Sequence, residues 1–272
     1  MRSAKELALD DKLTETVDGF RLSGKAAAVL RLLLLDDEVQ AAQEYANTVS
    51  IVRMGYNDHG PVHMRTVVYN SMIMLSLLRR AEVKTSLEKG GCGDFEDSVT
   101  AVICASMLHD LGMGVGRQDH ELYSAYLALP SLDRILIEAY GADLRKRVMI
   151  KALAVESISG HMGTRTIHSL EAGVVQVADG CDMTKGRARI PIALGMAPKT
   201  TGHIHQYSAN SIEEVRIGKG QEKPIRIDVH MSSEVGFFQV EEVLLKKIAG
   251  STAKSYIELY AQVREEEARQ YL

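Results

Sequence analysis

Several residue types that often define a protein class are scarce or absent in this chain. Its 272 residues include no tryptophan, four phenylalanines, five prolines and three cysteines. An odd number of cysteines (Cys92, Cys104 and Cys181), without paired zinc-ligand spacing, argues against a disulfide framework and favours a reducing compartment. No apolar run approaches the ~18 residues that suggest a membrane span, and the first residues lack the organisation of a signal peptide. We therefore expect a cytoplasmic protein with no membrane partner.

Charge of one sign is not in large excess either. Lys and Arg total 32 and Asp and Glu total 36, which gives a formal net charge of −4 at pH 7. Such a surface has no general affinity for nucleic-acid phosphates, so nucleic acid is not an expected partner. The composition, 46% hydrophobic and 25% charged, is ordinary for a globular protein. The length allows one large or two modest domains.

The first two-thirds of the chain has the spacing of amphipathic helices and no strand-like alternation. Apolar residues recur three or four positions apart in the segments 26–35, 36–54, 61–80, 95–110, 120–129, 131–140, 143–159 and 168–183. We expect Gly112 to end one helix in the left-handed conformation and Pro130 to end another. The pattern predicts a helical domain over residues 1–200, with its core at about 50–190.

The pattern changes near residue 201. Residues 225–231 (IRIDVHM) alternate apolar and polar, as do Val215 and Ile217, so the two segments predict a hairpin. Helical spacing over 237–248 and a third strand over 255–261 complete a small α+β unit, β-β-α-β, over residues 201–272, with a solvated helix at 264–270. A sheet of about three strands is marginal alone. The unit should therefore pack on the helical domain or pair with a second chain, and we expect a homo-oligomer.

The chemistry centres on the doublet His109-Asp110. An apolar helix (Val99, Val102 and Met107) runs directly into it. A polar pair at the end of a buried helix must be satisfied, and a metal ion is a favourable partner for an imidazole beside a carboxylate. The alternative is a histidine at a helix end that is merely paired with its neighbouring aspartate.

Further polar residues stand at predicted helix termini. A single histidine is more often a satisfied polar group than a ligand, but four of the nine histidines lie at such termini. Imidazole with carboxylate suits Mn, Fe, Ni, Co or Zn better than Mg alone. The candidate ligands to one or two divalent metal ions are His63, His109, Asp110, His120, His161 and Asp179.

The order His … His-Asp … Asp, carried by His63, His109-Asp110 and Asp179, resembles the HD superfamily of metal-dependent phosphohydrolases. Residues 169–189 (SLEAGVVQVADGCDMTKGRAR) are similar to the last motif of the HD domain in ribonuclease Y-like proteins. The resemblance covers about residues 50–190 and implies an HD-domain helical bundle. It also implies a first metal held by the residues that carry it.

For two-metal members, the resemblance implies two further histidines and a bridging role for the aspartate of the doublet. His120 and His161 occupy those positions, although some members have a tandem His-His where this chain has His161-Met162.

Cations are needed to bind a phosphoester. Arg117, Lys185, Arg187 and Arg189 lie just beyond candidate ligands, and we assign catalytic roles to Asp110, Arg117, Lys185 and Arg187; the alternative for the cations is solvated surface charge. Asp182 and Glu121 either orient water or a ligand or serve as a surface acid and a helix cap. His59 is the second choice to His63. His203 and His205 are expected to stay outside the site.

These residues predict a metal-dependent phosphohydrolase, a phosphomonoesterase or phosphodiesterase. It would hydrolyse a nucleotide or another small phosphorylated substrate with a metal-activated water. One alternative keeps the same ligands in an HD-type di-iron oxygenase that resembles inositol oxygenase. The other is a non-enzymatic sensor, in which the C-terminal unit binds a ligand and the helical part retains a metal.

Overall fold

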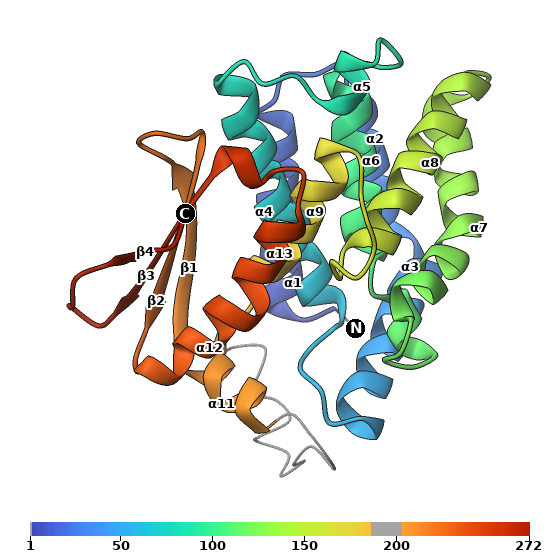
Figure 1. Ribbon diagram of the computed structural model, residues 1–272. Coiled ribbons are helices and arrows are strands. Elements are labelled where there is room, and N and C mark those ends of the chain that lie inside the picture. The colour runs from blue at the N-terminus through green and yellow to red at the C-terminus, as the bar shows by residue number, and fades with distance from the viewer. Residues whose placement is uncertain (1, 186–202) are drawn as a thin grey trace.

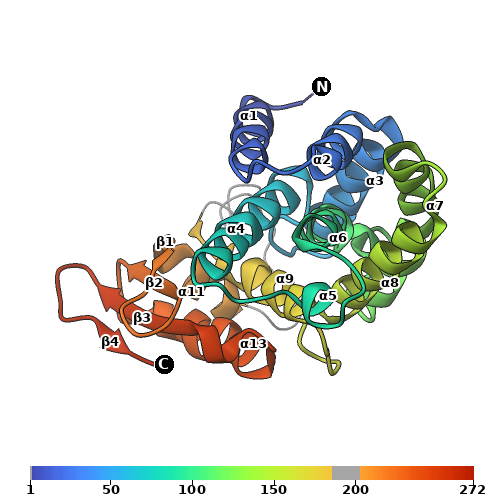
Figure 2. The same cartoon turned by 90° about the horizontal axis from the view of Figure 1, so that it is seen from above.

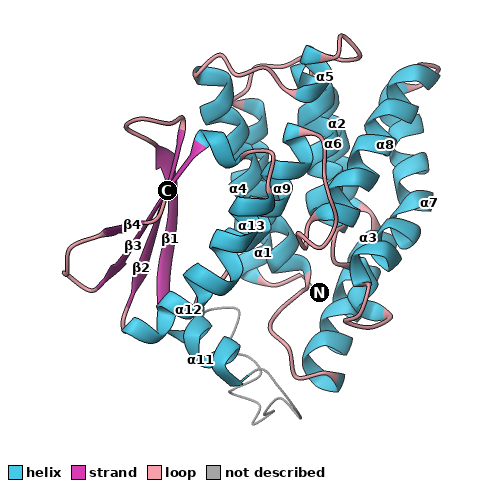
Figure 3. Cartoon of the chain, in the orientation of Figure 1, coloured by secondary structure: helices cyan, strands magenta, loops and turns pink. Residues whose placement is uncertain are grey.

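The computed structural model describes residues 2–185 and 203–272. Most of these residues are helical, and a small sheet lies at the C-terminal end (Figures 1 and 3). The predicted class, mainly α with a small α+β unit, is confirmed at that level. In the described part of the chain, no helix is both long and apolar enough to cross a membrane.

The helices before the sheet follow one another with short connections. They are α1 (Ala4–Asp18), α2 (Lys25–Leu35), α3 (Asp37–Thr48), η1 (Val49–Arg53), α4 (Pro61–Arg80), α5 (Ser86–Lys89), α6 (Phe95–Leu108), η2 (Leu111–Gly114), α7 (His120–Tyr140), α8 (Leu144–Gly160), α9 (Leu170–Cys181) and α11 (His203–Ser211).

Helix starts follow the local chemistry of the sequence. Pro61 occupies the first turn of α4, where its missing N–H removes no hydrogen bond. Side chains accept a hydrogen bond from a free N–H of the first turn at α3 (Asp36), α6 (Asp94), α8 (Asp143) and α9 (Ser169). Helix α1 was not among our predictions, although Ser3 and Glu6 form a capping box at its start.

The expectation that Pro130 ends a helix is wrong, because α7 continues through it to Tyr140. Proline removes the N–H that would bond the carbonyl four residues earlier. That carbonyl belongs to Tyr126, whose side chain is 74% exposed, so the carbonyl lies on the solvent side of the helix. We infer that water takes the place of the missing N–H and that the helix tolerates the proline.

The sheet has the order β1-β2-β3-β4. Strand β1 (Ile212–Lys219) pairs antiparallel with β2 (Ile225–Met231), and β2 pairs parallel with β3 (Ile257–Val263). The connection from β2 to β3 contains a nearly continuous helix made of α12 (Phe237–Gln239), η4 (Val240–Leu244) and α13 (Leu245–Gly250). The predicted β-β-α-β order is therefore confirmed.

The predicted helix over 264–270 is wrong. Residues Arg269–Gln270 form a short strand, β4, that pairs antiparallel with β3. The N–H of Tyr271 donates to the carbonyl of Leu259 at 2.8 Å, and the N–H of Leu259 donates to the carbonyl of Leu272 at 3.3 Å. The tail thus satisfies backbone groups at an otherwise open edge of β3, which a solvated helix would leave unpaired.

The C-terminal unit packs closely on the helical part through α9 and α4 (Figure 2). A Cβ at Gly173 of α9 would lie 2.2 Å from Oγ1 of Thr252, and one at Gly180 would lie 3.1 Å from Cδ of Lys247. Glycine at both positions lets α13 lie directly against α9. One hydrophobic core continues across the predicted boundary at residue 200, from Val177 in α9 to Leu244 and Ile248.

Candidate metal centre

The six predicted ligands meet at one point in the interior. Each lies at or beside a helix end: His63 in the first turn of α4, His109 after α6, His120 at the start of α7, His161 after α8, and Asp179 in the last turn of α9. Asp110 follows His109. All six are buried, with at most 8% of any residue exposed. Residues spread over more than a hundred positions of sequence are thus brought together.

The first group of ligand atoms surrounds Nε2 of His63. This nitrogen lies 3.2 Å from Nε2 of His109, 3.3 Å from Oδ2 of Asp110 and 3.2 Å from Oδ1 of Asp179. Two atoms that are each about 2.1 Å from one ion lie about 3.0–3.4 Å apart at octahedral or tetrahedral angles. These spacings therefore fit a single cation.

The second group uses the other oxygen of the same aspartate. Oδ1 of Asp110 lies 3.3 Å from Nε2 of His120 and 3.5 Å from Nε2 of His161, and the two nitrogens are 3.2 Å apart. Asp110 thus turns one oxygen to each group. The arrangement has the form of two adjacent cation sites that share a carboxylate, and these buried groups could hold metal ions.

The second ring nitrogen orients each histidine. Nδ1 lies 2.9 Å from the carbonyl of Ser106 in His109, 3.0 Å from that of Arg117 in His120, and 2.7 Å from that of Ile158 in His161. A carbonyl only accepts, so each Nδ1 is assigned the proton. The Nε2 atoms of the neutral rings then carry lone pairs that point at one another and at the carboxylates, as metal ligands do.

Protonation supports this assignment. Burial lowers the pKa of His161 to about 4, so its ring is neutral at pH 7. Burial also raises the pKa of Asp110, but His109, His59 and hydrogen bonds from the neighbouring histidines outweigh it and hold this pKa well below the usual range. The pKa of Asp179 is likewise held low, chiefly by Lys247 against the effect of burial. Neutral imidazole beside ionised carboxylate is the protonation state that binds a divalent cation.

His63 is oriented by a carboxylate instead of a carbonyl. Its Nδ1 lies 2.7 Å from Oδ2 of Asp182, which places this residue behind a ligand, one of its two predicted roles. Glu121 is buried and accepts a hydrogen bond of 3.2 Å from Thr164, so it ties the start of α7 to the loop after α8. Nδ1 of His59 is 2.6 Å from the carbonyl of Asn57, outside both groups of ligand atoms.

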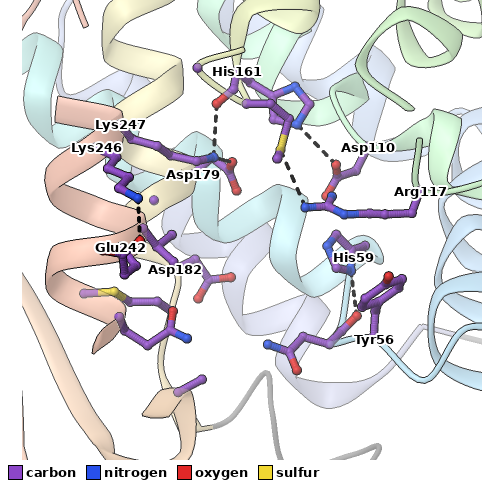
Figure 4. Close-up of a pocket in the computed structure, with 18 of the residues that line it drawn as sticks. Tyr56, His59, Asp110, Arg117, His161, Asp179, Asp182, Glu242, Lys246 and Lys247 are labelled. Atoms are coloured by element: carbon purple, nitrogen blue, oxygen red, sulfur yellow. Dashed lines mark hydrogen bonds and ion pairs between the residues drawn. The ribbon is translucent and has the colours of Figure 1, made fainter. Parts of the chain in front are cut away.

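A cavity of about 640 Å³ opens over the ligands, between the helical part and α13 (Figure 4). Asp110, His161 and Asp179 form part of its floor, and Tyr56, His59 and Asp182 line it as well. Its depth and polar floor are typical of a small-molecule site.

The predicted cations differ in position. Arg117 lines the cavity, and its Nη1 lies 3.3 Å from Nε2 of His120. Lys185 is exposed, with its ammonium 4.0 Å from Glu213, and it is not among the residues that line the cavity. Arg187 and Arg189 lie outside the described residues. The side chains of His203 and His205 are not described either.

Lys247 was not among our predictions. Its ammonium forms an ion pair with Oδ2 of Asp179 and donates to the carbonyl of His161 at 3.0 Å. The sequence does hold a signal: Lys247 follows Leu244 by three positions and precedes Ile248, so it lies on the apolar face of its helix. A lysine on a buried face requires a partner, and here the partner is a candidate metal ligand.

Gly112 is required, though for a different reason from the one predicted. It does not adopt a positive φ. A Cβ there would lie 2.0 Å from the carbonyl oxygen of His120 and 2.6 Å from the nitrogen of Ser124. Glycine therefore lets η2 lie against the first turn of α7, which brings His120 to Asp110.

Comparison with known proteins adds one relative. The chain is 41% identical over 247 residues to the uncharacterized protein MJ1020 of Methanocaldococcus jannaschii, which covers 90% of this chain and 92% of the relative. The chain belongs to the family of this archaeal protein. A match of this length cannot fit within residues 1–200, so the MJ1020 family shares both the helical part and at least part of the C-terminal unit. No family model matches the chain, and no solved structure matches it.

Proposed function

We propose that this protein is a metal-dependent phosphohydrolase of the HD superfamily that acts on a small phosphoester. The observation that carries the proposal is the position of Asp110, whose two oxygens face two separate groups of histidine nitrogens. His63, His109, Asp110 and Asp179 would hold one divalent cation, and His120, His161 and Asp110 a second. The chemistry of the donors favours Mn, Fe, Ni, Co or Zn over Mg alone.

When bound, such cations would supply a nucleophile at neutral pH and stabilise charge on the phosphoryl oxygens. The chain provides the rest. Asp182 and the backbone carbonyls fix the orientation of the imidazoles. The Nε2 of His120 cannot serve both a cation and the guanidinium of Arg117, so ligation at His120 leaves Arg117 available to an anionic oxygen on the wall of the cavity.

The test is a screen of the purified protein for hydrolysis of chromogenic phosphomonoesters and phosphodiesters after loading with Mn, Co, Ni or Mg. We expect turnover that disappears with a chelator and in Asp110→Asn. The matched control is Asp133→Asn, which changes an exposed aspartate paired with Lys151 and should keep full turnover.

Absence of turnover with every metal would overturn the proposal. Anaerobic loading with iron tests the oxygenase alternative in the same preparation. Because hydrolysis does not consume oxygen, an iron spectrum that changes only when oxygen is admitted with a substrate would favour the oxygenase. The sensor alternative predicts that Asp110→Asn keeps the cellular role of the protein.

A further inference from the structure

The C-terminal unit reaches the metal centre through a single charged side chain. Lys247 is 8% exposed, and its position on α13 places the ammonium at the floor of the cavity (Figure 4). The stem passes Gly180, where a Cβ would lie 3.1 Å from Cδ of the lysine. The path of this side chain is thus built into both helices.

The ammonium has a donor to spare. A lysine has three N–H donors, and in the described part of the chain two of them have partners, Oδ2 of Asp179 and the carbonyl of His161. Because Lys247 also lines the cavity, the third donor is available to a bound molecule.

A second cation faces it. Arg117 lies on the opposite side of the pocket, beside His120, whereas Lys247 lies beside Asp179 (Figure 4). The two positive side chains therefore flank the two groups of ligand atoms. A tetrahedral oxyanion that approached both groups would meet a charge on each side, the arrangement that proteins use to bind phosphate.

We propose that Lys247 is an anion-binding residue of this site, so that the C-terminal unit supplies one of the two side chains that hold the phosphoryl group of the substrate. The inference rests on the proposed function. It replaces the sensor role of the C-terminal unit with a direct part in substrate binding. It also accounts for a charged residue on the apolar face of α13, which packing alone would not favour.

The test measures binding of inorganic phosphate to the Mn-loaded protein by calorimetry. Lys247→Met keeps the length of the stem and removes the charge, and we expect the dissociation constant for phosphate to rise at least about tenfold. The bound Mn should stay at the wild-type stoichiometry. Lys247→Arg restores a charge and should recover part of the affinity. The matched control is Lys246→Met, which removes the exposed neighbour paired with Glu242 and should leave phosphate binding unchanged.

The outcomes separate the two proposals. Unchanged phosphate affinity in Lys247→Met would overturn the anion-binding role while leaving the phosphohydrolase proposal intact. Loss of Mn from the variant would also overturn it, because the lysine would then act through Asp179. Failure of the wild-type Mn-loaded protein to bind phosphate or to hydrolyse any phosphoester would overturn both. If Lys247→Met does not fold, phosphate should still protect Lys247 of the wild-type protein from reductive methylation, and absence of protection would contradict the inference.

Discussion

Asp182 and His63 form a hydrogen-bonded pair in which the carboxylate lies 2.7 Å from Nδ1 of the ring. The opposite nitrogen, Nε2, faces His109, Asp110 and Asp179. A carboxylate in this position fixes the ring and increases its basicity toward a cation.

We therefore predict that Asp182→Asn weakens metal binding by about 10–100-fold without changing the number of sites, because the partner acts through the ligand. Competition with a metal-sensitive dye measures this dissociation constant. Asp133→Asn is again the surface control. Equal affinities in the wild type and Asp182→Asn would show that the pair has no role in ligation.

The shared carboxylate predicts different stoichiometries for different ligand variants. His120→Ala removes a ligand from the second group only, so one strongly bound Mn should remain per chain. Asp110→Ala removes an oxygen from both groups, so neither ion should bind at micromolar protein. Elemental analysis after gel filtration gives the counts. The same loss in both variants would contradict a division into two sites.

Gly112 predicts a steric effect on stability. An added Cβ would lie 2.0 Å from the carbonyl oxygen of His120. Gly112→Ala should lower the free energy of unfolding by about 1–3 kcal/mol, as overpacking does. At Gly116, four residues on, an added Cβ would meet no atom within 4 Å, so Gly116→Ala should stay within about 0.5 kcal/mol of the wild type. Urea titration compares the two, and equal stabilities would show that η2 does not need its close approach to α7.

Glu96 predicts a pH dependence. From α6 it accepts hydrogen bonds from Ser23 and from the N–H groups of Gly24 at 2.9 Å and Ala26 at 3.1 Å, at the start of α2. Burial raises its pKa, but these donors outweigh burial and bring the pKa below the ordinary 4.5. The stabilisation is therefore complete above pH 4.5 and is lost as the pH falls through the lowered value.

Glu96→Gln should accordingly lower the free energy of unfolding by about 1–3 kcal/mol at pH 7. The difference from the wild type should shrink below pH 4.5. Glu15→Gln, at an exposed position of α1, serves as the control. A difference that stays constant from pH 7 to pH 3 would contradict the role of the ionised carboxylate.

The sequence was most informative where chemistry is local. Pro61 and the apolar spacing after it located His63 in the first turn of a helix, and the doublet at the end of α6 gave His109 and Asp110. Alternation over 225–231 gave the central pair of strands. These signals depend on the nearest few residues, so they survive without knowledge of packing.

The errors arose where distant segments decide the outcome. Pro130 did not break α7 because the affected carbonyl lies on the solvent side, and the tail paired with β3 because that edge was open. Lys247 could be noticed as a charge on an apolar face, but its partner, Asp179, lies 68 positions away in sequence. The cations after Asp179 were proposed from proximity in sequence, and Lys185 shows how weak that guide is.

The most direct measurement is an anomalous difference map from crystals grown with Mn²⁺ and recorded at the manganese edge. We predict two peaks on either side of Asp110, each about 2.0–2.3 Å from its ligand atoms. One should contact His63, His109 and Asp179, and the other His120 and His161. A map with no peak beside Asp110, while the four histidines keep the positions described above, would contradict the existence of the metal centre.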